Sequence, residues 1–444
     1  MIEELADYDG PLGPYADALA RRRIAVAADP HGRVALLRPD SVVLEFGDRY
    51  DEVERLVHDR GLEVLGGSLP TEPPASGTVA VRRGLRERVA TRPPRWKATQ
   101  LRQWVDDLQL DAVVARPNQV YLADGVARYF GLLDQTGAGT PGVTTPSAAV
   151  STVRPATRPP HLPEPLRLPD REPPDVLVLD TGLRTMDDHS RPEHPDLRGH
   201  CIVHQPWRDL RTVGRWDDED EPDDDRLGQL DEQAGHGTFI SGIIRQLCPD
   251  ARIHHRGVLT SYGDGDDASV ISAIERALAT MTGYDIVVMA FGTYGAADEQ
   301  PPLADAVRRL LRDSLVIASA GNDATSRPYY PAALPGVIAV GALDQAGRAR
   351  FSNFGSWVDA CAPAVDVVST FFDGFTERCG CCGSPTQTYE GWARWSGTSF
   401  AAPKVAGVIA QEMYLHGGTA RDAWARISGT TRHRHPDLGV VVNV

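Results

Sequence analysis

Short apolar runs alternate with longer amphipathic segments from about residue 175 onward, and this alternation restricts the possible folds more than any other feature. Continuous apolar runs indicate strands buried on both faces, and the segments between them have helical spacing. This order is typical of an α/β fold, a mostly parallel sheet with helices on both faces. The predicted strands are 175–180, 251–259, 285–292, 314–321 and 336–343, and the predicted helices are 267–281, 303–313, 399–415 and 419–427.

A different pattern precedes this sheet. Predicted elements between residues 40 and 123 follow the order β-α-β-β-α-β, which is typical of a small ferredoxin-like α+β domain. The next stretch is rich in Pro, Thr and Ala and has no period, so it is predicted to be a linker. We therefore expect three parts: residues 1–123, 124–170 and 171–444.

Charge and hydropathy exclude several partners. Residues 1–170 carry 21 basic and 23 acidic side chains, whereas residues 171–444 carry 25 and 38, so the second part is strongly acidic and nucleic acid is not an expected partner. No run of 18 apolar residues predicts a membrane span. The acidic N-terminus does not resemble a signal peptide, so a cytoplasmic location is expected, with export by another route left open.

Three reactive residues lie in separate glycine-rich motifs. Asp180 ends the apolar run in "VLVLDTG", His236 begins an apolar helix in "GHGTFISG", and Ser399 begins another in "SGTSFAAPKVAG". A serine hydroxyl becomes a strong nucleophile only beside a base, and the base needs an acid that orients it. Each motif alone has a structural explanation, but the set predicts a catalytic triad.

The order Asp180, His236, Ser399, with each residue in its own motif, resembles the subtilisin-like serine proteases, or subtilases, over about residues 172–430. The stretches "HPDLRG" (194–199) and "ASAGND" (318–323) match the family as well. The resemblance implies a subtilisin-like fold and a serine endopeptidase (hydrolase) that acts through an acyl-enzyme intermediate. A catalytically silent regulatory or binding protein on the same scaffold is the alternative.

The resemblance also implies roles around the triad. Asn322 would donate its amide to the oxyanion, although a residue that forms a turn after a strand is the structural alternative. Protein or peptide substrates would pair with one strand end and insert a side chain into a primary specificity pocket. The residues implied are Ala290, Phe291 and Gly292 along the cleft, and Ser319, Ala320 and Gly321 in a wall of the pocket. The family pattern differs at Ala290 and Phe291, so the preference of that subsite is open.

The N-terminal domain resembles a subtilase propeptide in element order and length only. This resemblance implies an intramolecular inhibitor whose last strand enters the cleft. The missing signal peptide and the retained N-terminal domain favour an intracellular processing or effector protease. An unrelated sensor or adaptor domain with the same fold is the alternative.

Two further features have no settled role. The acidic run 217–225 has no glycine-punctuated calcium loop, so a solvated insertion is favoured. Subtilases often bind calcium, which leaves that ion open without ligands, and no cofactor is expected to be required. The cysteines Cys379, Cys381 and Cys382 are compatible with zinc, a local disulfide or plain thiols.

Overall fold

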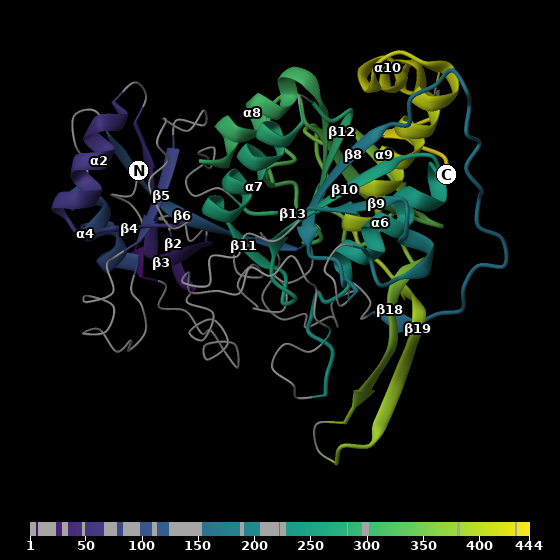
Figure 1. The fold of residues 1–444 in the computed structure, drawn as a ribbon, viewed down its shortest axis with the longest axis horizontal. Helices are drawn as coiled ribbons and strands as arrows, with labels where there is room; N and C mark the ends of the chain where they lie inside the picture. Colours follow the sequence, from purple (N-terminus) through teal and green to yellow (C-terminus); the bar gives the residue numbers. More distant parts are fainter. Residues whose placement is uncertain are drawn as a thin grey trace.

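A computed structural model gives the structure of the 444-residue chain. It describes residues 6–7, 24–28, 34–46, 49–65, 78–82, 98–108, 113–123, 153–186, 191–204, 222, 228–281, 283–294, 302–379, 382–430 and 433–444. Figure 1 shows two bodies, with the N-terminal elements on the left and the larger C-terminal part on the right.

The centre of the C-terminal part is a ten-stranded sheet, most of whose neighbouring strands are parallel. Only the short strands β16 and β20 pair antiparallel within it. The predicted fold class, a mostly parallel α/β sheet, is therefore confirmed. The strands, in their order across the sheet, are β20 Arg434–His435, β21 Gly439–Val441, β17 Ala360–Pro363, β15 Ile338–Asp344 with β16 Gly347–Arg348, β14 Leu315–Ser319, β12 Ile286–Met289, β8 Asp175–Thr181, β10 Arg252–Leu259 and β9 Cys201–Val203.

Helices cover both faces of this sheet because each central strand is apolar on both sides. In β8, Val176 and Val178 pack into the apolar cluster that contains α6 and α9, whereas Leu177 and Leu179 pack into the cluster that contains α7 and α8. Figure 1 shows these two layers on either side of the strands. The main helices are α6 His236–Leu247, α7 Asp267–Thr280, α8 Leu303–Asp313, α9 Thr398–His416 and α10 Ala420–Thr430, and a short 3₁₀ helix spans Pro195–Leu197.

The N-terminal part contains the predicted β-α-β-β-α-β order, preceded by two short strands. Its sheet is antiparallel and packs its apolar face on the two helices. The proposed limits of this domain stay a prediction. Its elements are β1 Ala6–Asp7, β2 Ala25–Ala28, β3 Val34–Glu45, α2 Tyr50–Asp59, β4 Glu63–Val64, β5 Thr78–Arg82, α4 Ala98–Leu108 and β6 Val114–Ala123.

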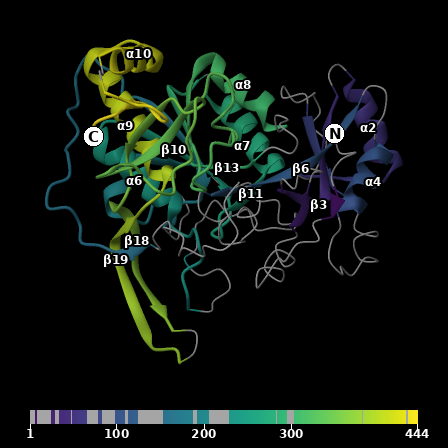
Figure 2. The same cartoon turned by 180° about the vertical axis from the view of Figure 1, so that it is seen from behind.

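The last strand of this part, β6, extends into the C-terminal part. There it pairs antiparallel with β11 (Asp264–Asp266) and β13 (Phe291–Gly292). Figures 1 and 2 view the molecule from opposite sides, and both show β6 running from the N-terminal elements to β11 and β13. One eight-stranded sheet thus includes strands of both parts.

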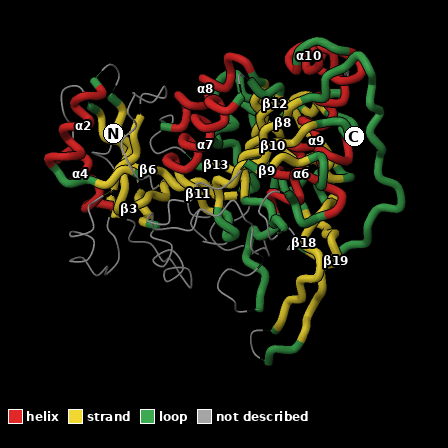
Figure 3. The backbone as a smooth tube through the Cα atoms, in the orientation of Figure 1, coloured by secondary structure: helices red, strands yellow, loops and turns green. Residues whose placement is uncertain are grey.

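Two segments differ from the simple pattern of strands and helices. The end of the predicted linker is bound to the C-terminal part, since β7 (Arg154–Pro155) pairs with β19 (Pro385–Trp395). The backbone N–H of Leu166 also donates to Asp250 over 2.8 Å. The long hairpin of β18 (Val367–Arg378) and β19, which the sequence did not predict, projects away from the body in Figure 3.

Candidate active site

Asp180 lies at the carboxyl end of β8, as predicted, and its side chain is fully buried. Its Oδ1 accepts a hydrogen bond of 2.8 Å from the backbone N–H of Thr181 and one of 2.6 Å from Nδ1 of His236. Because Oδ1 accepts from both donors, the aspartate is suited to hold a neighbouring imidazole in one orientation and one tautomer.

His236 begins helix α6, where two glycines allow the backbone to approach its neighbours closely. Gly235 has a φ of +81°, and a Cβ on Gly237 would overlap the carbonyl oxygen of Thr181. The imidazole is 1% exposed and packs edge-on against Trp395, with ring centroids 5.5 Å apart. Since Nδ1 donates to Asp180, the other nitrogen, Nε2, carries the lone pair; it is buried and has no hydrogen-bond partner among the described residues.

Ser399 is the second residue of helix α9, so its backbone N–H is one of the helix amides without an intrahelical acceptor. The side chain is 1% exposed. Its hydroxyl donates to the carbonyl oxygen of Ala290 over 3.3 Å. The hydroxyl therefore lies at the end of strand β12, close to the predicted cleft.

Asn322 follows strand β14, and its amide is oriented by the start of helix α9. Its Oδ1 accepts from the backbone N–H of Thr398 over 2.9 Å and from the Thr398 hydroxyl over 3.0 Å. The amide nitrogen Nδ2 is buried and makes no hydrogen bond within the described part of the chain. This nitrogen lies 3.4 Å from the position that a Cβ on Gly397 would take, two residues before Ser399.

The predicted cleft residues Ala290, Phe291 and Gly292 are all buried, and strand β6 pairs with the last two of them. Leu122 pairs with Gly292 and Ala123 with Phe291. On its other side, β6 pairs with β11 over residues 264–266. An extended segment of this same chain thus lies between two strand ends of the C-terminal part.

The predicted pocket wall follows β14. Ser319 and Ala320 are fully buried, and Gly321 has a φ of +95° and donates its N–H to the Thr398 hydroxyl over 3.1 Å. The sequence reasoning missed Tyr329, whose ring lies against Gly321. An isolated aromatic residue has no sequence signal that would have identified it.

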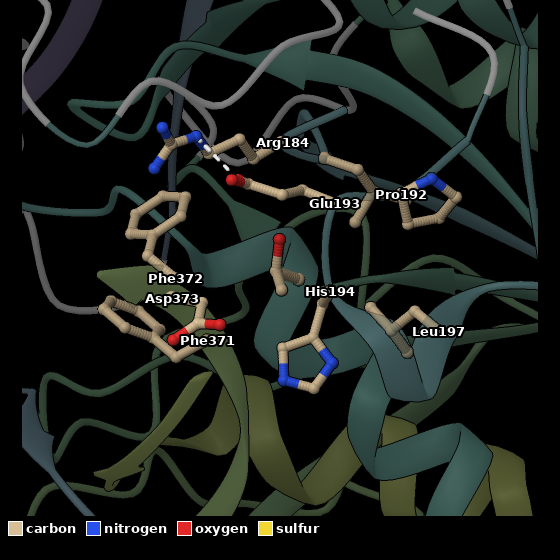
Figure 4. Close-up of a pocket in the computed structure, with 10 residues that line it drawn as sticks. Arg184, Pro192, Glu193, His194, Leu197, Phe371, Phe372 and Asp373 are labelled. Carbon is tan, nitrogen blue, oxygen red and sulfur yellow. Dashed lines mark ion pairs between the residues drawn. The ribbon is translucent and has the colours of Figure 1, made fainter. Parts of the chain in front are cut away.

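A small cavity of about 10 Å³ adjoins Thr238 in the first turn of helix α6. Figure 4 shows the residues that line it. The Arg184–Glu193 ion pair (2.8 Å) and His194 lie at its edge, with Phe371 and Phe372 opposite. None of the predicted site residues lines it, and its volume accommodates about one water molecule, so it is not a substrate pocket.

No group of three or more His, Cys, Asp or Glu side chains in the described part of the chain could hold a metal ion. The acidic run 217–225 lies outside the described residues except Pro222, and so does Cys381. Calcium therefore stays a prediction. Helices long and apolar enough to cross a membrane are also absent from the described ranges.

The chain belongs to the subtilase family: the family model matches residues 174–437, more than half of the chain. It is 32% identical to a thermophilic serine proteinase of Bacillus sp. (strain AK1) over 53% of this chain and 51% of that protein. It is 31% identical to thermitase of Thermoactinomyces vulgaris over 57% of this chain and 80% of that protein. A crystal structure of a cold adapted subtilisin-like serine proteinase aligns with 61% of this chain and 88% of that chain, at 23% identity and a TM-score of 0.45. The chain thus spans about half the length of the first of these relatives.

Proposed function

We propose that this protein is a serine endopeptidase whose triad is Asp180, His236 and Ser399. The observation that carries this proposal is the hydrogen bond of 2.6 Å from His236 Nδ1 to Asp180, which leaves a buried Nε2 without a partner among the described residues. A neutral imidazole nitrogen of this kind can act as a general base toward a neighbouring hydroxyl. Family membership supports the same activity.

In the proposed reaction, the Ser399 hydroxyl turns from the Ala290 carbonyl toward His236 Nε2 and attacks the substrate carbonyl carbon. His236 takes the hydroxyl proton and then gives it to the leaving amine, which leaves an ester on Ser399. Water hydrolyses this ester by the same proton transfers in reverse. Asp180 stabilises the imidazolium through its hydrogen bond with Nδ1.

Charge that develops on the carbonyl oxygen would be stabilised by Asn322 Nδ2 and the backbone N–H of Ser399. The first donor is held by Thr398, and the second lies at the positive end of helix α9. Because Thr398 already orients the Asn322 amide, little reorganisation of this donor would be needed when the charge forms.

The competing candidate, a silent scaffold, makes a different prediction for a fluorophosphonate probe, which forms a covalent bond with an activated serine. We expect the wild-type protein, after any self-cleavage is complete, to be labelled and Ser399→Ala to be unlabelled. Ser396→Ala is the matched control, because Ser396 is also buried but accepts from the N–H of Asp366. Labelling lost equally in both variants, or absent from the wild type under all conditions, would favour the silent scaffold.

We also propose that the N-terminal domain is an intramolecular inhibitor that the enzyme removes, in keeping with an intracellular processing protease. Residues 120–123 lie between β11 and β13, where an extended substrate would pair. Ala123 pairs with Phe291, one residue from the carbonyl that holds the Ser399 hydroxyl. We therefore expect a cut within the first residues after Ala123, inside the predicted linker 124–170.

Mass spectrometry of the purified full-length protein tests this role. The wild type should separate into an N-terminal fragment of about 123 residues and the remainder, whereas Ser399→Ala should stay whole. A wild-type chain that stays uncut while hydrolysing peptides at full rate would favour the sensor or adaptor alternative. Cytoplasmic location stays a prediction.

A buried carboxylate links the two parts and gives the docked state a pH dependence. Asp267 accepts from the Tyr121 hydroxyl and the Gln119 N–H, each over 2.8 Å, and from the Leu303 N–H over 3.2 Å. Burial raises the pKa of Asp267 to about 7, the three hydrogen bonds partly oppose this shift, and the charge of Asp266 adds to it.

A further inference from the structure

Tyr329 lies between the two chain segments that flank the proposed nucleophile. A Cβ added to Gly292 would overlap the Tyr329 ring, and a Cβ on Gly321 would be 3.1 Å from its Cδ1. The ring is therefore in contact with both glycines. No other side chain could fit in that space without displacing it.

These two segments leave neighbouring parallel strands, since Met289 of β12 pairs with Ala318 of β14. Each segment also contacts the start of helix α9. The Ala290 carbonyl holds the Ser399 hydroxyl, and the Gly321 N–H donates to Thr398. The space between the segments thus adjoins the carbon that Ser399 would attack, and it is where the side chain on the acyl side of the scissile bond (P1) has to go.

The frame around Tyr329 is rigid. Its ring packs on Tyr294 with centroids 4.8 Å apart, and Tyr294 donates its hydroxyl to Asp323 over 2.7 Å and accepts from Asn353 over 2.8 Å. The next residue, Tyr330, exchanges two backbone hydrogen bonds of 2.8 Å with Thr293. Tyr329 is 3% exposed, so its ring cannot turn toward solvent without breaking this packing.

We infer that Tyr329 is a specificity-determining residue that fills the primary pocket and limits P1 to small side chains such as those of glycine, alanine and serine. This inference rests on the proposed endopeptidase activity. The Tyr329 ring would exclude large P1 side chains sterically, because a long or aromatic side chain would have to displace this buried ring from its close packing.

The test compares two peptide nitroanilides, Tyr-Leu-Ala-Ala and Tyr-Leu-Ala-Phe, whose first three residues copy 121–123. The full-length wild type, after any self-cleavage is complete, should show a kcat/KM at least about 100-fold higher for the alanine peptide. Tyr329→Gly should raise the rate for phenylalanine relative to alanine by about 100-fold. Tyr329→Phe, the matched control, keeps the ring and should keep the wild-type ratio.

Because each variant is judged by the ratio of its rates for the phenylalanine and alanine peptides, differences in the amount of active enzyme between variants do not affect the result. If Tyr329→Gly does not fold, as shown by loss of fluorophosphonate labelling, Tyr329→Ala replaces it. A wild type that hydrolyses both peptides equally, or a ratio unchanged when the ring is removed, would overturn the inference. Hydrolysis of neither peptide together with no labelling of the wild type would instead refute the proposed activity.

Discussion

Arg38 of the N-terminal domain makes a buried ion pair with two carboxylates of the C-terminal part. Its Nη2 donates to Asp264 over 2.7 Å and its Nε to Asp266 over 3.0 Å. The three residues are 8%, 3% and 5% exposed. Burial alone would lower the pKa of Arg38, but the two carboxylates outweigh it and raise the pKa. The guanidinium therefore stays charged and bridges the two parts.

Replacing Arg38 with methionine should weaken the docking of the two parts far more than it weakens the fold of either one. In the docked state Asp264 and Asp266 would lose their buried cation, which typically costs about 3–5 kcal/mol. In the separated state both carboxylates can be hydrated, so the penalty falls on docking. The docking equilibrium constant should fall by about 140- to 3,700-fold, at 1.4 kcal/mol for each factor of ten.

Hydrogen exchange measures this loss directly. The experiment uses full-length protein that carries Ser399→Ala, so that the proposed self-cleavage cannot occur. Amides in the strand 264–266, which pairs with β6, should lose about 140- to 3,700-fold of protection in Arg38→Met; the Asp266 N–H is left out because it donates to Ser269 within the C-terminal part. Arg82→Met is the matched control, because Arg82 is equally buried and pairs with Glu63 inside the N-terminal domain.

Protection of 264–266 that is unchanged in Arg38→Met would refute the view that this ion pair stabilises docking. Loss of the same size in both variants would mean that the exchange reports unfolding of the N-terminal domain and not separation of the two parts.

Three further predictions concern the site and its pH dependence. Ser399→Ala and His236→Ala should each abolish peptide hydrolysis, and Asp180→Asn should lower kcat by about 10⁴-fold; an unimpaired rate in any of them would contradict the triad. Asn322→Ala should lower kcat by about 100- to 1,000-fold with KM unchanged, whereas a change in KM alone would indicate a structural role. The pKa of Asp267 is raised from its ordinary value of 3.8 to about 7, so the docked state holds a proton that the separated state has already lost. Docking should therefore weaken as pH rises from 3.8 to about 7. In the same hydrogen-exchange measurement, corrected for intrinsic exchange rates, Asp267→Asn should remove most of this dependence of protection on pH. A wild-type protein whose protection does not change with pH would contradict this account.

Most of the central sheet could be predicted because each of its main strands is a continuous run of apolar residues in the sequence. Residues 176–179 are all apolar and fully buried, so no tertiary information was needed to recognise that strand. The predicted strand 285–292 was only partly right. It divides at Ala290 into β12 and β13, because Phe291 leaves the parallel sheet to pair with Ala123. The partner of β13 lies more than 160 residues away in the chain, beyond what periodicity can indicate.

The hairpin of β18 and β19 was missed for a different reason. Its outer half is largely exposed on both faces, and its register is irregular at Asp373 and Phe375. Strands that project from the body bury no continuous face, so they lack the alternation by which strands are recognised. Tyr329 was missed because its importance comes from contacts with two glycines that only the folded chain brings together.

The cut that removes the N-terminal domain and the limit on P1 constrain each other. Both proposals apply to the sequence that follows Ala123, which reads Asp-Gly-Val-Ala-Arg-Tyr-Phe. A pocket filled by Tyr329 excludes cleavage after Tyr129 or Phe130 and favours Gly125 or Ala127, the small residues that follow the end of β6 at Ala123. The mass of the released fragment should therefore correspond to a cut after Gly125 or Ala127. A fragment that ends at Tyr129 or Phe130 would show that the pocket accepts a large ring and that Tyr329 does not fill it.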